Sequence, residues 1–289
     1  ILTPSLIILF WPYLWESPLI NFIHAFKAFS IHAWYGSNLY FAKYISPSNL
    51  PWHYIFVWIG ITTPVFYLAL LLIGLSNYTW RLKNRLFKIN DNESLNDLWR
   101  GEKELQDLIF YICFALPIFI VILFNSNLYD GWRHLYFIYP SLLLISLNGL
   151  YIIRIKYFRK KVYTFIFIVG LFLIQVSYVM IKNHPHQNVY FNFMAGKNVE
   201  MKFELDYWGL SNKQAFEYIL QNDSKNKILI GSASTNILER SKQILKKSDR
   251  NRILPSENIN ADYIIDNYRN WDGVPKKEYK IPMNFKIYK

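Results

Sequence analysis

A single cysteine, Cys113, occurs in the 289 residues, so the chain cannot form an internal disulfide. The sequence therefore does not indicate a redox compartment, and we expect Cys113 to act as a small apolar side chain. Also missing are an initiator methionine, a basic stretch before the first apolar run, Ile1 to Trp15, and a small-residue cleavage site after it. This run is not typical of a signal peptide. We expect a chain that begins inside a membrane helix and is part of a longer protein.

Common catalytic patterns are absent too. The sequence has no serine–histidine–acid arrangement, no nucleotide-binding loop and no pair of carboxylates with evident acid and base roles. Gly231-Ser232-Ala233-Ser234 follows a predicted strand, but it lacks the phosphate-loop lysine and the dinucleotide glycine spacing. His184-Pro185-His186 offers two metal ligands without a third. We accordingly predict no catalytic residue, no metal and no cofactor among these residues.

Long apolar segments dominate the first two-thirds of the chain. Four of them reach the roughly 17–25 residues that a membrane-spanning helix requires. They lie at about 54–75, 108–124, 135–153 and 162–181. With the truncated helix at the start, we predict an α-helical polytopic membrane domain of about five spans over residues 1–183. Pro64 and Pro117 lie within spans, where we expect them to kink the helix rather than end it.

The formal net charge of +12 does not indicate nucleic-acid binding, because much of the positive charge flanks the apolar segments. Cytoplasmic loops of membrane proteins are enriched in lysine and arginine. The two loops at about 76–107 and 154–161 carry most of the basic residues near the spans, so we place them in the cytoplasm. The segments at 16–50 and 125–134, and everything after Lys182, then lie on the outer side.

Two further parts are predicted on that outer side. Asn21, His24 and Lys27 form a narrow polar stripe on an otherwise apolar stretch, which predicts a helix at about 18–34 in the plane of the membrane interface. Residues 184–289 alternate helical and strand patterns, which predicts a small soluble α/β domain. Its expected helices are at 212–220 and 237–246, and its expected strands are at 227–232, 252–254, 261–265 and 280–288.

The segment Tyr129-Asp130-Gly131-Trp132-Arg133-His134 places a carboxylate, a guanidinium and an imidazole directly before an apolar span. Ionisable side chains at that depth are costly and indicate a functional site. The guanidinium of Arg133 matches the geometry of a phosphate. In the alternative interpretation Arg133 extends to lipid headgroups and Asp130 only pairs with it.

Two other groups of residues have a functional and a structural interpretation. Lys43 and His53, in a tyrosine-rich segment, can border a lipid-linked substrate or can simply anchor the chain at the interface. Glu204 to Gly209 has the composition of a sugar-contacting loop, but it is equally typical of a capped turn before the helix at Asn212. By composition we interpret the second group as structural.

Three stretches together resemble one family. They are Trp34-Tyr35-Gly36 with Leu50-Pro51-Trp52-His53-Tyr54 and Thr62-Thr63-Pro64, then Tyr129 to His134 with Tyr139-Pro140, and last His184-Pro185 with Val189-Tyr190-Phe191-Asn192 and Glu204 to Gly209. Over about residues 10–215 the sequence resembles the latter half of bacterial integral-membrane glycosyltransferases of the protein-mannosyltransferase-like, family 39-type GT-C class.

The resemblance implies an enzyme of the cell envelope that moves a sugar from a polyprenyl-phosphate donor to a lipid, glycan or protein acceptor. It implies a multi-pass protein of the bacterial plasma membrane, working at the outer face. Arg133, His134 and Asp130 would lie at the donor phosphate, with Lys43 and His53 at the edge of the same cavity. The catalytic aspartate of the family belongs to an upstream outer loop, so none is assigned here. A transporter or flippase of lipid-linked saccharide, or a non-catalytic membrane scaffold, are the alternatives.

Overall fold

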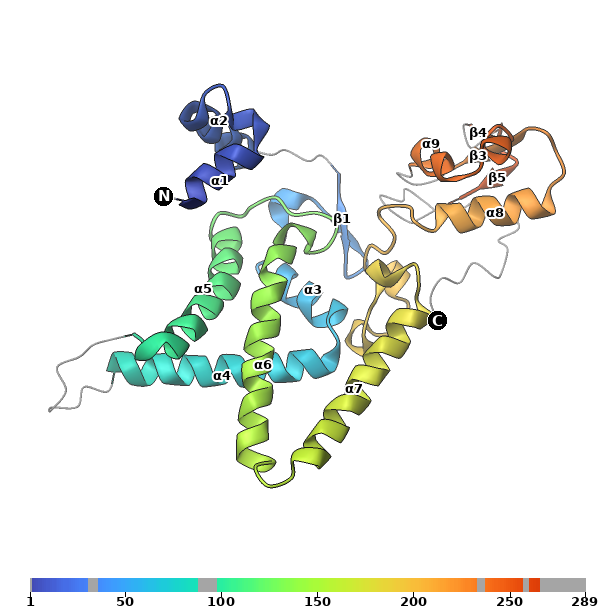
Figure 1. Ribbon diagram of the computed structural model, residues 1–289. Helices are drawn as coiled ribbons and strands as arrows, with labels where there is room; N and C mark the ends of the chain where they lie inside the picture. Colours follow the sequence, from blue (N-terminus) through green and yellow to red (C-terminus); the bar gives the residue numbers. More distant parts are fainter. Residues whose placement is uncertain (1, 31–35, 88–97, 233–236, 257–259, 266–289) are drawn as a thin grey trace, which may run out of the picture.

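The computed structural model describes residues 2–30, 36–87, 98–232, 237–256 and 260–265. The chain is mostly helical, with four long apolar helices and a small region that contains a three-stranded parallel sheet (Figure 1). The predicted strand at 280–288, the end of the helix predicted at 18–34 and the motif residues Trp34 and Tyr35 lie outside the described residues.

The four long helices are α4 (Val65–Phe87), α5 (Gly101–Leu123), α6 (Tyr139–Tyr157) and α7 (Val162–Lys182). A 3-10 helix, η3 (Arg133–Ile138), leads directly into α6. Each of the four has the length and composition of a membrane span, because about 20 apolar residues at 1.5 Å per residue cover the hydrocarbon core. These helices suggest a multi-pass membrane protein. The helix at the N-terminus, α1 (Leu2–Phe10), has nine residues and is not among them.

The first predicted span, at 54–75, is in fact two helices. The helix α3 (Tyr54–Thr62) ends before Pro64, and Thr63 has an extended backbone, the conformation that a following proline favours. The kink predicted at Pro64 is therefore wrong, whereas Pro117 stays inside α5 as expected. The side chain of Asn192 donates hydrogen bonds to the carbonyl oxygens of Gly60 and Thr63. These bonds satisfy carbonyl groups at the end of α3 that otherwise have no helical partner.

Much of the predicted cytoplasmic loop at 76–107 is helical. Helix α4 continues to Phe87, and its basic side chains pair with acids in the first two turns of α5. Arg81 lies 2.8 Å from Asp107, and Arg85 lies 2.9 Å from Glu104. The number of basic residues predicted a loop for Arg81 and Arg85, because it does not reveal that each has an acidic partner on α5. Cys113 on α5 is exposed rather than a filler between side chains.

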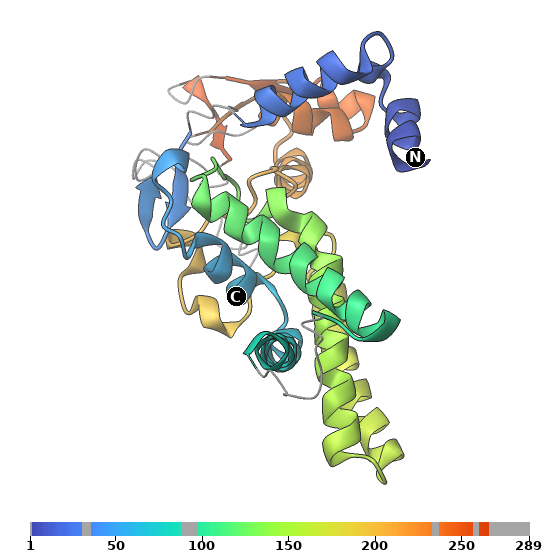
Figure 2. The same cartoon turned by 90° about the vertical axis from the view of Figure 1, so that its left-hand side faces the viewer.

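Helices α4 and α6 form the tightest contact between long helices, and they cross steeply rather than side by side (Figures 1 and 2). At the crossing, a Cβ atom on Gly74 would overlap the carbonyl oxygen of Ile145, and one on Gly149 would overlap that of Leu70. The hydroxyl of Ser146 also donates to the carbonyl oxygen of Tyr67 across the helices. Glycine at both positions therefore permits backbone-to-backbone contact.

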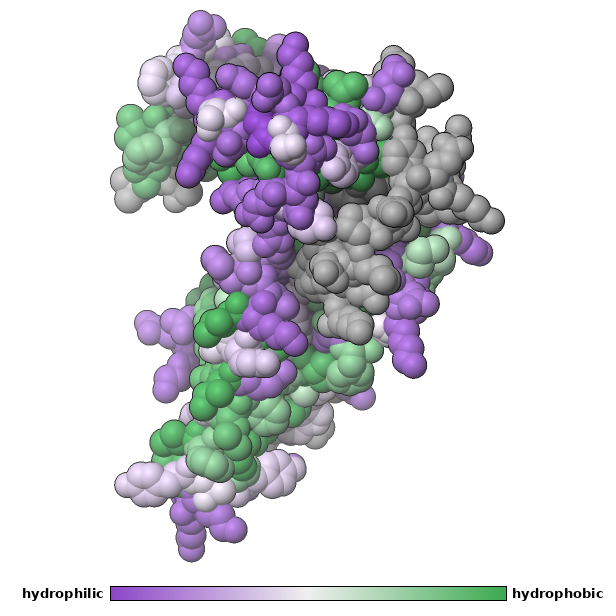
Figure 3. Space-filling model, turned by 90° about the vertical axis from the view of Figure 1, so that its right-hand side faces the viewer, coloured by the Kyte–Doolittle hydropathy of each residue, from purple (hydrophilic) through white to green (hydrophobic). Residues whose placement is uncertain are grey.

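In contrast, α7 has no buried residue and contacts α4 through the stacked rings of Phe66 and Phe172, 4.1 Å apart. Figure 3 shows hydrophobic side chains over the lower part of the molecule, where the α6–α7 hairpin lies, and hydrophilic ones over the tail. The helix α2 (Pro18–Ser30) confirms the first part of the helix predicted at 18–34. Its apolar side chains are exposed, namely Leu19, Ile20, Phe22, Ile23 and Phe26.

The tail after α7 contains α8 (Asn212–Asn222) and three parallel strands, β3 (Ile228–Gly231), β4 (Ile253–Pro255) and β5 (Tyr263–Ile264), in the order β4-β3-β5. These confirm the helix and three of the strands predicted there. The helix expected at 237–246 is confirmed in part, because α9 (Leu238–Ser241) continues directly into the 3-10 turn η7 (Lys242–Ile244). The helical stretch ends at Leu245, which is extended and packs into the core. A further short helix, α10 (Lys247–Arg250), follows.

A small hairpin connects the helices to the tail. Strands β1 (Asn38–Tyr40) and β2 (Lys43–Ile45) pair antiparallel, and Phe203 forms an isolated bridge with Tyr40. The remaining short 3-10 helices are η1 (Pro12–Leu14), η2 (Pro47–Asn49), η4 (Gln187–Val189), η5 (Phe193–Ala195) and η6 (Val199–Met201). The hairpin thus places residues from three distant parts of the sequence around the start of η3.

Candidate functional site

The turn before η3 gives the site its shape. Asp130 and Gly131 both adopt a left-handed backbone, with φ of 57° and 71°. At Gly131 an added Cβ atom would lie 3.3 Å from the indole of Trp58, so glycine provides both the conformation and the close approach. Aspartate is one of the few other residues that adopt this conformation at moderate cost. The turn places Asp130 beside Asn38 of the hairpin.

Asn38 of β1 holds this turn from the other side. Its side-chain amide donates to the carbonyl oxygen of Leu128 at 2.9 Å and accepts from the backbone N–H of Asp130 at 3.3 Å. Both Asn38 and Asp130 are buried, with relative exposures of 0% and 1%. Buried polar groups are stable only when they are hydrogen-bonded, and these bonds fix the backbone that carries the Asp130 carboxylate.

Arg133 is held by a carboxylate and two aromatic rings. Its Nη1 lies 3.2 Å from Oδ2 of Asp130, and the guanidinium carbon lies 4.6 Å from the ring centroid of Tyr129 and 5.8 Å from that of Tyr207. The Nε–H of Arg133 is buried and has no hydrogen-bond acceptor among the described residues. The side chain is 25% exposed, so the guanidinium is oriented and still reachable from solvent.

The segment 203–207 completes the site, and the sequence did not predict this role for it. Oε1 of Glu204, which is 3% exposed, accepts from the backbone N–H of Leu39 at 3.4 Å. Oδ1 and Oδ2 of Asp206 accept from the backbone N–H groups of Leu210 and Ser211 at 3.0 and 2.7 Å. Those bonds confirm the interpretation of 204–209 as a capped turn before α8. The same turn, however, places Tyr207 against Arg133.

Of the predicted site residues, the structure brings Asp130 and Arg133 into direct contact. The ring of His134 is exposed and lies 4.5 Å from that of Tyr129. His53 contacts Tyr40, with 2.7 Å between Nδ1 and the hydroxyl. Burial raises the pKa of Tyr40 to about 12, so its hydroxyl stays protonated, and the tautomer of His53 decides which of the two atoms donates. Lys43 is exposed on β2.

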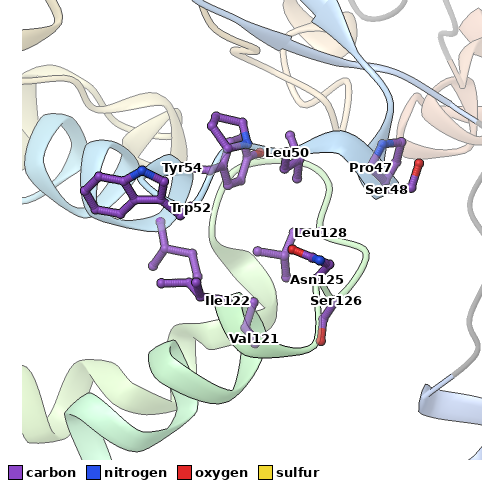
Figure 4. A pocket seen from close by; sticks show the side chains of 12 residues that line it. Pro47, Ser48, Leu50, Trp52, Tyr54, Val121, Ile122, Asn125, Ser126 and Leu128 are labelled. Atoms are coloured by element: carbon purple, nitrogen blue, oxygen red, sulfur yellow. The ribbon is translucent and has the colours of Figure 1, made fainter.

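A pocket of about 340 Å³, which includes space open to solvent, lies between residues 47–55 and the C-terminal end of α5. Leu50, Val121, Ile122 and the exposed indole of Trp52 give it an apolar wall, and Ser48 and Ser126 give it a polar one (Figure 4). It also contacts the site, because Leu128 lines the pocket and accepts the hydrogen bond of Asn38.

Both His184 and His186 make hydrogen bonds within the protein. His186 is buried, and its Nε2 lies 3.1 Å from the side-chain oxygen of Gln214, while Nδ1 of His184 lies 3.0 Å from the side-chain nitrogen of Gln187. Within the described ranges, no group of three histidine, cysteine, aspartate or glutamate residues is suited to hold a metal ion.

Comparison with known proteins gave no match to a family model, to a curated protein or to a solved structure.

Proposed function

We propose that the chain is the C-terminal part of a membrane glycosyltransferase that transfers a sugar from a polyprenyl-phosphate donor to an acceptor at the outer face of the bacterial plasma membrane. The resemblance of its motifs to GT-C glycosyltransferases suggests this class. The physical support is Arg133, an oriented guanidinium that stands at the start of a long apolar helix.

The surroundings of Arg133 suit a phosphate ligand. The ion pair with Asp130 uses Nη1, so other N–H groups of the planar guanidinium can donate to phosphate oxygens. The Nε–H has no acceptor among the described residues, and an anion or a water molecule would supply one. The phosphodiester of a polyprenyl-phosphate sugar carries one negative charge, and the remaining N–H donors of Arg133 can bind its oxygens without a metal ion.

The charge distribution supports an outward-facing site. Arg154 and Lys156 lie in the last turn of α6, at the opposite end from Arg133, and Arg159, Lys160 and Lys161 follow in the loop to α7. A basic loop of this kind favours the cytoplasmic side. The Arg133 end and the tail after α7 would then face outward, and the apolar wall of the pocket beside the site would suit part of a lipid chain.

A second candidate, a transporter or flippase of lipid-linked saccharide, has one observation in its favour. The break between α3 and α4 at Thr63 resembles the interrupted helices that form transporter sites. A transporter would bind the same lipid phosphate but would transfer no sugar, so the two functions differ in the reaction and not in the first binding step.

Replacing Arg133 tests the phosphate site. We expect Arg133→Ala to weaken binding of a polyprenyl monophosphate by about ten- to a hundredfold, because hydrogen bonds to a charged group contribute roughly 1.5–3 kcal/mol. Arg133→Lys keeps the charge but loses the planar donors, so an intermediate affinity is expected. The measurement is a titration of the purified chain in lipid nanodiscs, at a temperature where each variant is folded.

Arg154→Ala is the matched control, because Arg154 is an arginine at the other end of α6 and donates to the carbonyl oxygen of Phe158. Its affinity for the lipid phosphate should equal that of the wild type. In the full-length protein, sugar transfer should be lost with Arg133→Ala and retained with Arg154→Ala. Equal affinities for the two alanine variants would remove Arg133 from the proposed site.

A further inference from the structure

The segment that leads from the last long helix to the tail returns to the Arg133 site. The backbone N–H of Ala42 donates to the carbonyl oxygen of Lys202 at 3.3 Å, and Phe203 bridges Tyr40. These contacts fix the segment beside the hairpin just before it reaches Tyr207. A side chain of the tail segment therefore lies at a fixed place next to the guanidinium.

Tyr207 makes two contacts there. Its ring lies over the guanidinium carbon of Arg133 at 5.8 Å, and its hydroxyl shares a hydrogen bond with that of Tyr136 in η3. The ring of Tyr129 lies nearer to the guanidinium, at 4.6 Å. An arginine side chain has several rotatable bonds, and a guanidinium that lies over the face of an aromatic ring is stabilised in that orientation. Two rings and the Asp130 carboxylate together restrict the guanidinium far more than the ion pair alone.

We infer that Tyr207 is a positioning residue, which holds the guanidinium of Arg133 in the orientation that receives a lipid-linked phosphate. This inference rests on the proposed function of Arg133. It extends the site to the tail segment, so that the phosphate site is complete only when residues 203–211 are in place.

The local structure keeps Tyr207 in position. Asp206, 5% exposed, accepts the N–H groups of Leu210 and Ser211 and so fixes the turn that carries Tyr207. At the end of this turn the buried Asn212 donates to the hydroxyl of Ser241 in the tail. Burial, with a contribution from Tyr136, raises the pKa of Tyr207. The phenol is therefore protonated at neutral pH and keeps its hydrogen bond to Tyr136.

Removal of the ring tests the inference. We expect Tyr207→Ala to weaken binding of a polyprenyl monophosphate about three- to tenfold, in line with the loss of one cation–π contact. Tyr207→Phe keeps the ring and should bind within about twofold of the wild type on the same grounds. Trp208→Ala is the matched control, since Trp208 is the adjacent aromatic residue, is 54% exposed, and has its ring 6.0 Å from that of Tyr207, whereas the ring over Arg133 is that of Tyr207; its affinity should not change.

A second measurement reports on Arg133 without the lipid. Phenylglyoxal modifies accessible guanidinium groups, and mass spectrometry gives the rate at Arg133 alone. We expect a severalfold faster modification in Tyr207→Ala and in Asp206→Ala, and the wild-type rate in Tyr207→Phe and Trp208→Ala. A faster rate with the ring removed supports the positioning role even in a protein that binds no lipid phosphate.

The two proposals fail separately. If Arg133→Ala binds the lipid phosphate like the wild type, the proposed function is wrong, and the modification rate still decides the role of Tyr207. If Tyr207→Ala changes neither the affinity nor the modification rate, Tyr207 only packs against the site and the inference is wrong. Equal losses of affinity in Tyr207→Ala and Trp208→Ala would also overturn it, because they would indicate a general effect of the tail.

Discussion

Gly149→Val is expected to destabilise the protein by about 3 kcal/mol or more, because overpacking at a close contact typically costs 1–3 kcal/mol and here meets backbone atoms. A Cβ atom at position 149 overlaps the carbonyl oxygen of Leu70 and lies 3.0 Å from the backbone nitrogen of Gly74. Neither group can move without shifting α4. The two helices must therefore separate, which also lengthens the hydrogen bond from Ser146 to Tyr67.

Gly170→Val supplies the control for this substitution. Gly170 lies in the middle of α7, and no atom of the described residues lies within 4 Å of a Cβ atom there. Valine has a better helix propensity than glycine, by a few tenths of a kcal/mol, so this variant should be as stable as the wild type. Unfolding of both variants in mild detergent, followed by circular dichroism, gives the comparison. Equal midpoints for the two valine variants would contradict the tight crossing of α4 and α6.

The broken helix at Thr63 illustrates what the sequence could not predict. Proline within an apolar run is tolerated in many membrane helices, so the local sequence allowed either a kink or an end. The outcome depends on Asn192, whose amide donates to the carbonyl oxygens of Gly60 and Thr63 and whose backbone N–H donates to that of Ile61. These groups lie about 130 residues away along the chain, and no periodicity in the sequence connects them to α3.

The candidate site also combines contacts that the local sequence predicts with contacts between residues far apart in the chain. Asp130 and Arg133 are three residues apart, so their ion pair was predictable from spacing and charge. Asn38 and Tyr207 reach them from 92 and 74 residues away, counted to Asp130 and to Arg133. Tyr207 belongs to a motif that the sequence interpretation treated as a capped turn, and the structure shows that the turn also carries an aromatic contact to Arg133. Local chemistry was predictable, whereas the partners that the hairpin brings together were not.

Arg133→Ala is expected to destabilise the protein by about 3 kcal/mol, the lower end of the cost of removing one partner from a buried ion pair. The reason is the asymmetry of the pair. The side chain of Asp130 is 1% exposed, whereas that of Arg133 is 25% exposed. Without the guanidinium, the carboxylate stays in a place that water barely reaches. Arg133 alone, in contrast, is near enough to the surface to be partly solvated.

The stability of Asp130→Asn shows whether Arg133→Ala is destabilised by the buried charge of Asp130 or by the loss of side-chain packing. Asparagine also tolerates the left-handed conformation at position 130, so the turn and its bond to Asn38 are kept. With the charge gone, Asp130→Asn should cost less than Arg133→Ala. The double variant Asp130→Asn/Arg133→Ala should then be more stable than Arg133→Ala alone, by about 1–2 kcal/mol, because no unpaired charge is left buried.

A double-mutant cycle on thermal or denaturant unfolding measures this coupling. If the double variant loses the sum of the two single effects, the ion pair makes no contribution of its own, and Arg133 would be held by Tyr129 and Tyr207 alone. A recovery of stability together with an unrecovered affinity for lipid phosphate is the expected combination. It would separate the two roles of the guanidinium, since the fold needs Arg133 only to neutralise Asp130, whereas the proposed ligand needs the donors of Arg133 itself.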